Sequence, residues 1–474
     1  MADQPNDRRR QARRAQALRG FHRNDAIVAP DSDTIAAIAT APGKGGIGIV
    51  RVSGRDLRPL ITGILGKFPE PRKAIRSKFL DSGGEGLDEG LAIYFVGPAS
   101  YTGQDSLELH GHGGPVVVQM VLERCLELGA RPAQPGEFTQ RAFLNDKLDL
   151  AQAEAVADLI DAATTLSARS AMRSLSGEFS RVIESLVAQL IELRMLVEAT
   201  LDFPEEDIEP ADRSQSVARL EKLSMETTRA LERGRRGSIL RSGLNVVIAG
   251  RPNMGKSSLL NALAGEDLAI VTAIPGATRD AIRQAIQIEG VPLNIIDTAG
   301  LRDTADEVEV LGIGRTWEMI ERADAALLIV EAGRGVLPED EVILSRLPAG
   351  IARIVVHNKL DLTTDEACRE TEGENQVVRL SAKTGQGLNL LRAALLEIAG
   401  WQPGSEDVFM ARTRHLDALV RAAGHLDNAA EVASQIELFA EELRLAQAEL
   451  SSITGEFAAD DLLGEIFSRF CIGK

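Results

Sequence analysis

The sequence contains little cysteine and no long apolar run. Among 474 residues there are three cysteines, Cys125, Cys368 and Cys471, and no two of them form a Cys-x-x-Cys pair. This excludes a disulfide scaffold and a cysteine zinc site, and it indicates a reducing compartment. No apolar segment approaches the roughly 18 residues that a membrane-spanning helix needs. We therefore expect a cytoplasmic protein that has no membrane segment.

The chain is also poor in positive charge. Its 53 Lys and Arg residues face 70 Asp and Glu residues, so the net charge is −17, and any contact with RNA needs a local basic patch. Residues 1–30 are the exception, with seven arginines and three aspartates. They lack the apolar centre of a secretory signal and predict a disordered tail. A transit peptide is the alternative, which the acidic residues and the absence of serine before Ser32 disfavour.

Length and patterning predict about three domains, one of them interrupted by another. Residues 31–145 read as short strands with glycine-rich turns, whereas residues 146–242 read as helices. In residues 243–400, apolar runs alternate with amphipathic stretches, as in a parallel sheet covered by helices on both faces. Helical patterning returns in residues 401–474. The expected fold is therefore an α/β domain inserted into an all-α domain, preceded by a separate N-terminal domain.

The strongest motif is the segment Gly250–Ser257, which reads GRPNMGKS. It follows an apolar strand, Asn245–Ala249, and it opens a predicted helix at Lys256. Its glycines allow backbone N–H groups to approach phosphates closely. Lys256 supplies a cation to the terminal phosphates, and the hydroxyl of Ser257 can ligate Mg²⁺. The segment predicts a nucleotide phosphate site.

Three further motifs follow in the order of a GTP-binding domain, each after an apolar strand: Asp297-Thr298-Ala299-Gly300, Asn358-Lys359-Leu360-Asp361 and Ser381-Ala382-Lys383. The first places a carboxylate near Mg²⁺ and the Gly300 N–H at the γ-phosphate. The carboxylate of Asp361 can accept two hydrogen bonds from guanine, which adenine does not offer. The third motif is suited to a loop around the base. Together they predict a GTP-binding domain.

The residue after the first of these motifs excludes a conventional Ras mechanism. Ras-like proteins have a glutamine there that positions the attacking water, but this chain has Leu301. An acidic segment follows, and on chemistry alone any of its carboxylates can orient water: Asp303, Asp306, Glu307 and Glu309.

These motifs resemble the MnmE/TrmE family of tRNA modification GTPases, and the resemblance runs from about Asp33 to Lys474. The segments that carry it, besides the nucleotide motifs, are Asp33–Gly54, Leu107–Pro115, Pro135–Asp161 and the terminal Cys-Ile-Gly-Lys. The resemblance implies a homodimer. It also implies a folate-binding α+β domain at the N-terminus, a helical domain, and a Ras-like, doubly wound G domain inserted in the helical domain.

The resemblance implies that GTP hydrolysis accompanies a modification of certain tRNAs. With an FAD-dependent partner, GidA (MnmG), in a heterotetramer, the family adds an aminomethyl or carboxymethylaminomethyl group to carbon 5 of the wobble uridine. The one-carbon unit comes from a tetrahydrofolate, in its 5-formyl or 5,10-methylene form. The family's folate contacts map onto Arg51, Glu108, Lys147 and Lys474. Here the cations Arg51 and Lys147 suit a folate's carboxylates, and Glu108 suits its amino groups.

The resemblance further assigns the nucleotide and ion contacts. The nucleotide contacts outside the three later motifs are Asn253, Met254, Gly255, Lys256, Ser257, Ser258, Thr272, Ala273, Ile274, Pro275, Gly276, Ala277 and Thr278. It implies Mg²⁺ ligation by Ser257 and Thr278. When two G domains pair, it implies a K⁺ ion at Asn253, Thr272, Ile274 and Ala277.

Two residues carry the catalytic expectations beyond Lys256 and Thr278. Glu309 is implied to orient the water, and Cys471 to serve tRNA modification but not GTP hydrolysis. The family commonly has threonine where this chain has Ala277. A methyl group cannot ligate K⁺, so we expect a weakened K⁺ site.

Two other functions compete with this interpretation. An RNA-binding assembly GTPase of the Era type needs a KH-like domain with a Gly-x-x-Gly loop, and residues 408–457 contain none. A folate-binding module with a vestigial G domain conflicts with the intact Lys256, Thr278 and Asp297. A metal site at His110 and His112 is a further possibility, but the sequence shows no third ligand.

Overall fold

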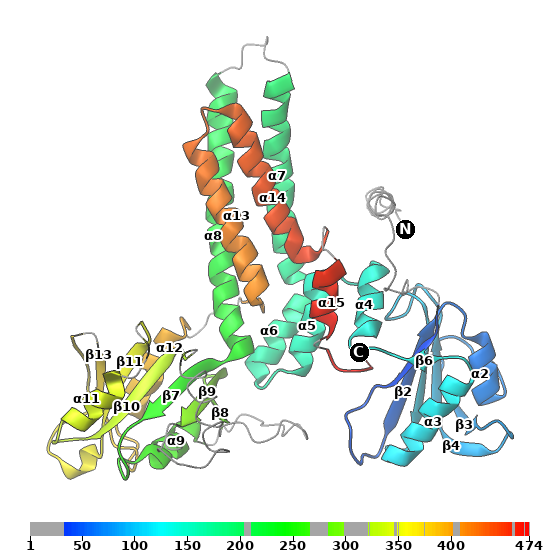
Figure 1. Ribbon diagram of the computed structural model, residues 1–474, viewed down its shortest axis with the longest axis horizontal. Coiled ribbons are helices and arrows are strands. Elements are labelled where there is room, and N and C mark those ends of the chain that lie inside the picture. Colours follow the sequence, from blue (N-terminus) through cyan, green and yellow to red (C-terminus); the bar gives the residue numbers. More distant parts are fainter. Residues whose placement is uncertain are drawn as a thin grey trace. The chain divides into compact units, whose positions relative to one another are not determined.

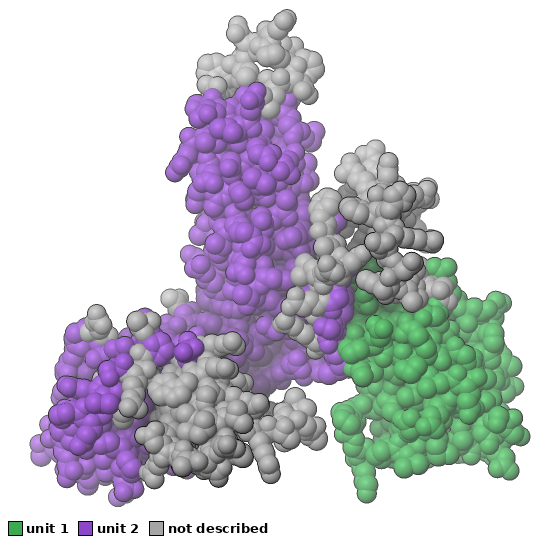
Figure 2. Space-filling model, in the orientation of Figure 1, with its two compact units in different colours: residues 1–145, 472–474 green, residues 146–471 purple. Residues whose placement is uncertain are grey.

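Figure 1 shows the computed structural model of the chain. The residues that it describes are 33–202, 210–265, 283–297, 321, 323–345, 348, 350–373, 375–401, 408–456, 460–468 and 470–473. The basic tail lies outside them. The chain divides into two compact units, coloured separately in Figure 2: unit 1 is residues 1–145 with 472–474, and unit 2 is residues 146–471.

Unit 1 is a six-stranded sheet with helices packed on it. The strand order is β3-β4-β5-β2-β1-β6, and only β1 and β6 pair in parallel. The strands are β1 (Ile35–Ile38), β2 (Gly48–Gly54), β3 (Ile75–Leu80), β4 (Gly86–Phe95), β5 (Asp105–Gly111) and β6 (Arg131–Pro132). The helices are α2 (Arg58–Leu65), α3 (Pro115–Glu127) and α4 (Glu137–Leu144).

Alternation along two paired strands determines the faces of this sheet. Val50 and Val52 of β2, together with Leu107 and Leu109 of β5, are buried in a core shared with α2 and α3. Because side chains alternate between the faces of a strand, the residues between them, Arg51 and Glu108, project to the other face. The pair is thereby kept out of the apolar core.

The helical part of unit 2 comes from both ends of its sequence. Its helices are α5 (Leu150–Ile160), α6 (Thr165–Leu175), α7 (Glu178–Asp202), α8 (Pro210–Ser242), α13 (Thr413–Glu431), α14 (Ile436–Thr454) and α15 (Asp460–Ser468). Figure 1 shows α7, α8, α13 and α14 side by side as a bundle. One face of α7 is buried at Ile183, Leu186 and Leu190, whereas Ile191 is exposed.

The residues between α8 and α13 form a seven-stranded sheet of order β12-β13-β11-β10-β7-β9-β8. Its strands are β7 (Leu244–Ala249), β8 (Arg283–Ile288), β9 (Val291–Asp297), β10 (Ala325–Glu331), β11 (Ala352–Asn358), β12 (Arg369–Glu372) and β13 (Asn375–Arg379). The helices are α9 (Lys256–Ala264), α11 (Pro338–Ser345), α12 (Leu388–Ile398) and the 3₁₀ turn η2 (Leu360–Leu362). Both edge strands, β8 and β12, are antiparallel to their neighbours.

The fold class predicted from the sequence is confirmed: a mostly parallel sheet interrupts a helical domain. After β13, every element that the structure describes is helical, so the KH-like sheet that an Era-type protein needs has no counterpart there. The last two described residues, Ile472 and Gly473, belong to unit 1. Gly473 is buried there, and a Cβ atom on it would lie 2.4 Å from the backbone oxygen of Ile38. No helix in the described ranges is both long and apolar enough to cross a membrane.

Candidate nucleotide-binding site

The predicted nucleotide motifs meet at one edge of the seven-stranded sheet. β7, β9, β10, β11 and β13 run parallel, so their carboxyl ends lie together. The phosphate loop follows β7, Asp297 ends β9, Asn358 ends β11, and Ser381 comes shortly after β13. Ligands of open α/β sheets bind at this edge. The topology therefore assembles motifs that are far apart in the sequence.

The phosphate loop needs its glycines. Gly250 has φ 145° and Gly255 has φ 90°, in the region that side chains avoid. A Cβ on Gly250 would lie 2.5 Å from the oxygen of Ile329, and one on Gly255 would lie 2.4 Å from Nδ2 of Asn358. The loop is therefore held tightly, with its backbone open for a ligand to approach the N-terminus of α9.

The polar side chains of the loop lie where phosphate chemistry needs them. Nζ of Lys256 donates a hydrogen bond to the oxygen of Gly250 at 2.6 Å, so the ammonium lies over the loop. Ser257 and Ser258 are exposed in the first turn of α9, whose unpaired N–H groups attract anions. Asn253 is also exposed, at a left-handed φ of 65°. This arrangement can hold a phosphate chain.

Asn358 joins the phosphate loop to the loop after β13. Its Nδ2 donates to the oxygen of Met254 at 2.9 Å, and its Oδ1 accepts from the N–H of Ala382 at 3.0 Å. The side chain is buried. The motif predicted a place for Asn358 in the nucleotide site. The structure shows in addition that Asn358 is a bridge within the protein, which sequence spacing alone does not reveal.

Asp361 is held in place by the loop after β13. Oγ of Ser381 donates to its Oδ1 at 2.6 Å, while the N–H of Thr384 donates to that same Oγ at 3.2 Å. Asp361 and Lys383 are exposed. Nζ of Lys359 lies 3.8 Å from Oε1 of Glu331. A fixed carboxylate with one oxygen outside these bonds suits the recognition of two neighbouring N–H donors.

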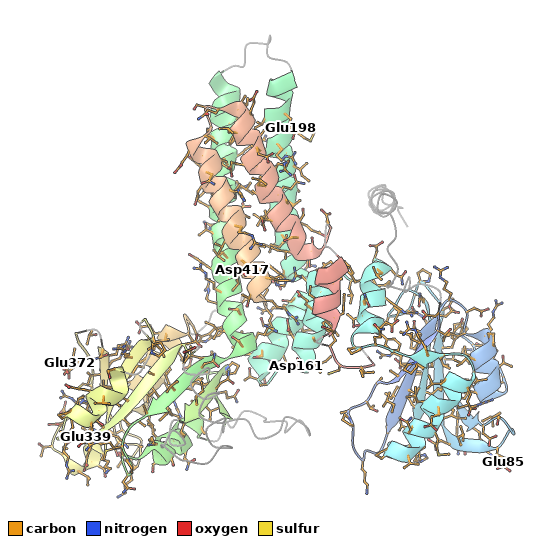
Figure 3. All side chains as sticks on the ribbon, viewed as in Figure 1. Glu85, Asp161, Glu198, Glu339, Glu372 and Asp417 are labelled. Atoms are coloured by element: carbon orange, nitrogen blue, oxygen red, sulfur yellow. The ribbon has the colours of Figure 1, made fainter. Side chains whose placement is uncertain are left out.

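One contact of the phosphate loop was not predicted. Nε of Arg251 lies 3.1 Å from Oδ1 of Asp340, and Nη1 lies 3.4 Å from Oε2 of Glu339, which is labelled in Figure 3. Asp340 is completely buried and also accepts from the N–H of Leu337 at 3.1 Å. Arg251 therefore ties the loop to the start of α11. In the sequence it was only one of the variable positions of the motif.

The remaining nucleotide and ion predictions lie outside the described residues. These are the segment 272–278, the motif residues Thr298, Ala299 and Gly300, and Glu309. Of Asp297, the structure describes only the backbone at the end of β9. The roles assigned to these residues in Mg²⁺, K⁺ and water positioning stay predictions.

In unit 1, the structure brings two of the predicted folate residues together. Arg51 and Glu108 are opposite each other in the β2–β5 pair, and Nη2 of Arg51 lies 2.9 Å from Oε1 of Glu108. His110 approaches the other carboxylate oxygen at 3.1 Å. The guanidinium also lies 5.6 Å from the ring centre of Tyr101 and 5.9 Å from that of Phe138. The result is a half-buried ion pair beside two aromatic rings.

A buried ionic network supports this pair from α4. The side chain of Arg141 is 1% exposed, and its Nη2 lies 2.9 Å from both Asp33 Oδ1 and Glu137 Oε1. Burial raises the pKa of Glu137, but hydrogen bonds from Arg131 and Arg141 outweigh burial and hold that pKa below its usual value. The hydroxyl groups of Tyr101 and Thr139 lie 2.9 Å apart. Phe138, the ring beside Arg51, is therefore carried on a firmly anchored helix.

The other sequence-predicted residues are more isolated. Lys147 is exposed in the loop before α5, in unit 2. Cys471 is exposed as well, and Lys474 is outside the described residues. Nδ1 of His112 lies 2.7 Å from Oδ1 of Asp88. In the part of the chain that the structure describes, no three His, Cys, Asp or Glu side chains are grouped as a metal site.

Comparison with known proteins gives matches over almost the whole chain. Residues 150–471 match the family model described as the MnmE helical domain, and residues 34–147 match that of the GTP-binding protein TrmE N-terminus. The tRNA modification GTPase MnmE of Thiobacillus denitrificans is 60% identical over 445 residues, which cover 94% of this chain and 99% of that protein. The protein of the same name from Dechloromonas aromatica is 60% identical over 447 residues, with coverages of 94% and 100%.

Proposed function

The chain belongs to the MnmE/TrmE family of tRNA modification GTPases, and we propose that it hydrolyses GTP to GDP and phosphate as part of a tRNA modification reaction. The observation that carries this proposal is the phosphate loop, which is fixed to the Asp361–Ser381 pair through Asn358. One rigid edge thus presents phosphate-binding and guanine-binding groups together. The names of the relatives support the link to tRNA.

We propose that the modified position is carbon 5 of the wobble uridine, which receives a carboxymethylaminomethyl or aminomethyl group. An FAD-dependent subunit, GidA (MnmG), acts with a homodimer of this chain in the proposed reaction, which takes place in the cytoplasm. The support is the match to both family models.

In the proposed hydrolysis, Lys256 transfers its hydrogen bond from the Gly250 oxygen to the terminal phosphates. Ser257 and Thr278 would hold a bound Mg²⁺, which would neutralise phosphate charge. Glu309 orients the attacking water, because Leu301 has no polar group for this task. The chain's own contribution is therefore positioning and charge stabilisation rather than covalent chemistry.

Potassium dependence tests this mechanism. We expect K⁺ to stimulate steady-state GTP hydrolysis more than Na⁺ or Cs⁺ at matched ionic strength, but only above the low millimolar range, because Ala277 offers no hydroxyl ligand. Ala277→Thr should lower the K⁺ concentration that is needed. Glu309→Ala should reduce hydrolysis by about 10²-fold or more. Full stimulation of the unaltered chain by low millimolar K⁺ would refute a weakened site, and equal rates in all three cations would refute the K⁺ mechanism.

For the one-carbon donor, we propose a tetrahydrofolate that contacts Arg51, Glu108, Lys147 and Lys474. The residues of unit 1 fit such a ligand, because the Arg51–Glu108 pair offers both a cation and a carboxylate beside the rings of Tyr101 and Phe138. Bound there, the folate would supply the carbon. The four contact residues would bind and orient the folate, and Arg141 holds α4, the helix that carries Phe138, in place.

Cys471 gives a second test of the proposal. We expect Cys471→Ser to retain GTP hydrolysis, since its position near the chain terminus lies outside the nucleotide motifs, and to lose modified uridine. The measurement is nucleoside analysis of tRNA from cells that carry the variant, beside the GTPase rate of the purified protein. Cys368→Ser is the matched control, because Cys368 is a second accessible cysteine in unit 2. Normal uridine modification in the Cys471 variant would disprove the role.

A further inference from the structure

A row of buried hydroxyl groups along α6 contacts the seven-stranded sheet's domain at three connections: the turn between β8 and β9, the entry from α8 and the return to α13. The four residues are spaced by three, three and four positions, so they share one helix face: Thr164, Ser167, Ser170 and Ser174. Thr164 donates to the oxygen of Gly290 at 2.8 Å, and Ser167 donates to that of Leu240 at 2.6 Å. Ser170 and Ser174 donate to the oxygens of Val408 and Met410 at 3.3 and 3.2 Å. None of these bonds follows from the nucleotide motifs.

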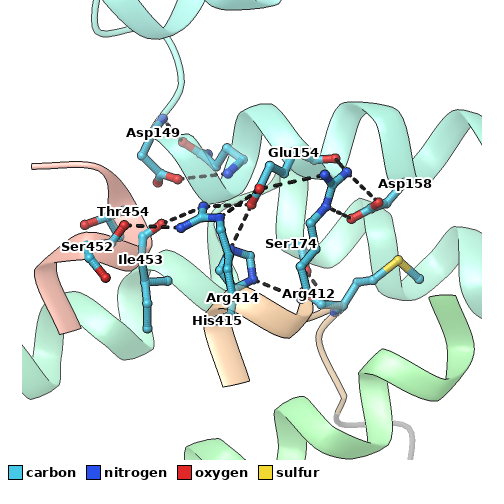
Figure 4. Close-up of polar contacts among 12 residues, drawn as sticks. Asp149, Glu154, Asp158, Ser174, Arg412, Arg414, His415, Ser452, Ile453 and Thr454 are labelled. Atoms are coloured by element: carbon cyan, nitrogen blue, oxygen red, sulfur yellow. Dashed lines mark hydrogen bonds and ion pairs between the residues drawn. The ribbon is translucent and has the colours of Figure 1, made fainter. Parts of the chain in front are cut away.

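Two of these connections are held by several bonds each. Where the chain leaves α8 for β7, Leu240 is bonded to Ser167, and Nε of Arg241 lies 2.9 Å from Oδ1 of Asp158. Where the chain returns to α13, Arg412 also pairs with Asp158, at 2.8 Å (Figure 4), and Met410 bonds to Ser174 through both its N–H and its oxygen. α5 and α6 thus form a fixed base for the inserted sheet.

The third connection is different, because it is the turn of the β8–β9 hairpin. Glu289 and Gly290 form a tight two-residue turn, with φ of 49° and 81°. The only polar contact that the structure describes between this turn and α6 is the hydroxyl of Thr164. A Cβ on Gly290 would lie 3.0 Å from Cβ of Leu166, so the two elements are also in close apolar contact.

The hairpin connects this turn to the nucleotide edge. β8 begins five residues after Thr278, a predicted Mg²⁺ ligand, and β9 ends at Asp297, the first residue of the motif Asp297-Thr298-Ala299-Gly300. The two strands are paired along their whole length, from Arg283 opposite Ile296 to Ile288 opposite Val291. The paired hairpin, roughly 20 Å long at 3.4 Å per residue, is a continuous hydrogen-bonded connection between the nucleotide edge and Gly290.

We propose that Thr164 is a positioning residue through which α6 senses the nucleotide-dependent position of the β8–β9 hairpin, and that this contact couples GTP hydrolysis to tRNA modification. The proposal rests on the function proposed above. The base formed by α5 and α6 stays fixed at the two strongly bonded connections, while the hairpin turn shifts against the N-terminus of α6. The coupling concerns the tRNA reaction, so hydrolysis itself does not depend on the Thr164 hydroxyl.

Thr164→Asp separates the two roles of this side chain. Thr164 also caps α6, accepting the N–H of Ser167 at 3.1 Å, and aspartate is an equally good cap. A carboxylate cannot donate to the Gly290 oxygen, so the cap remains while the contact between the elements is lost. We expect uridine modification to fall about 10-fold or more, within the usual range of coupling between sites, while GTP hydrolysis changes by less than about 3-fold. Thr164→Ser is the conservative variant. Its hydroxyl can still cap α6 and donate to the Gly290 oxygen, so modification should stay normal.

Amide hydrogen exchange of the full chain tests the coupling without relying on a variant. With GDP and with a non-hydrolysable GTP analogue, we expect different exchange rates in α6 of the unaltered protein and equal rates in Thr164→Asp. The matched control is Thr227→Val, which removes a buried hydroxyl whose bond in the described residues lies within α8, to Leu223 at 2.9 Å. It should leave modification and the exchange difference intact.

The outcomes separate this inference from the proposed function. Nucleotide-independent exchange of α6 in the unaltered chain, or normal modification by Thr164→Asp, would overturn the coupling while GTP hydrolysis and tRNA modification still stand. If the unaltered chain neither hydrolyses GTP nor supports uridine modification, the proposed function fails, and the coupling fails with it.

Discussion

Replacing Glu154 by glutamine should lower the free energy of unfolding of unit 2 by about 3–5 kcal/mol. The side chain is 2% exposed and accepts two hydrogen bonds from Arg414, at 2.8 and 2.7 Å (Figure 4). Nε2 of His415 lies 2.8 Å from Oε2, and Arg412 is 3.7 Å away. Without the carboxylate, the largely buried Arg414 loses its anion while Arg412 keeps Asp158, and a buried unpaired charge is costly.

The pH dependence of stability should show the same cluster. Burial raises the pKa of Glu154, but His415 and Arg414 outweigh burial and hold that pKa far below its usual value. Burial lowers the pKa of His415, which Glu154 only partly offsets. Both groups therefore take up protons more readily in the unfolded chain. The stability from His415 decreases as the pH falls below its usual pKa of 6.5, and that from Glu154 decreases below 4.5.

Urea unfolding followed by circular dichroism measures this loss, and amide exchange of α5 and α13 locates it. Glu449→Gln is the matched control, because it removes a carboxylate paired at 2.8 Å with Arg421, whose side chain is 54% exposed. The control should lose at most about 1 kcal/mol. In Glu154→Gln, the decrease of stability below pH 4.5 should become shallower. A loss no larger than that of the control would show that the cluster does not support α5 and α13.

The sequence predicts those parts of the nucleotide site that local order determines. Apolar runs predicted a strand before each motif, and these are β7, β9, β11 and β13, so the parallel topology brings the motifs together. Chance spacing does not produce such an order. The bridge made by Asn358 was not predictable, because its partners Met254 and Ala382 are chosen by the packing of two loops.

Contacts between distant segments set the limit of the sequence interpretation. Glu154 and Arg414 are 260 positions apart, and Thr164 and Gly290 are 126 apart. Read singly, each looks like an ordinary charged, polar or turn residue. In unit 1, helix α3 was also missed, because its β-branched run Val116–Val118 favours a strand. Pro115 at the first helical position and the burial of Val118, Val121 and Cys125 on one face determine the helix instead.

Replacing Asp361 by asparagine should change the base that the protein binds. We expect the affinity for GDP to fall by about 10⁴-fold, because the carboxylate is proposed to accept both the ring N–H and the exocyclic amine of guanine. Ser381 donates to Oδ1 of Asp361 at 2.6 Å, and the asparagine oxygen can still accept that bond. The amide NH₂ then faces the base. It repels the amine of guanine, but it can donate to the carbonyl that xanthine has at the same position.

Titration calorimetry with GDP and XDP measures this exchange of specificity. The variant should bind XDP more tightly than GDP, whereas the unaltered chain should show the reverse preference. The matched control is Asp365→Asn, which removes the same charge from an exposed side chain four positions after Asp361. This variant should bind GDP normally. An Asp361→Asn protein that keeps its affinity for GDP would place the base elsewhere. The bonds of the Ser381 loop with Asn358 and Asp361 would then hold the two loops together without orienting a carboxylate toward the base.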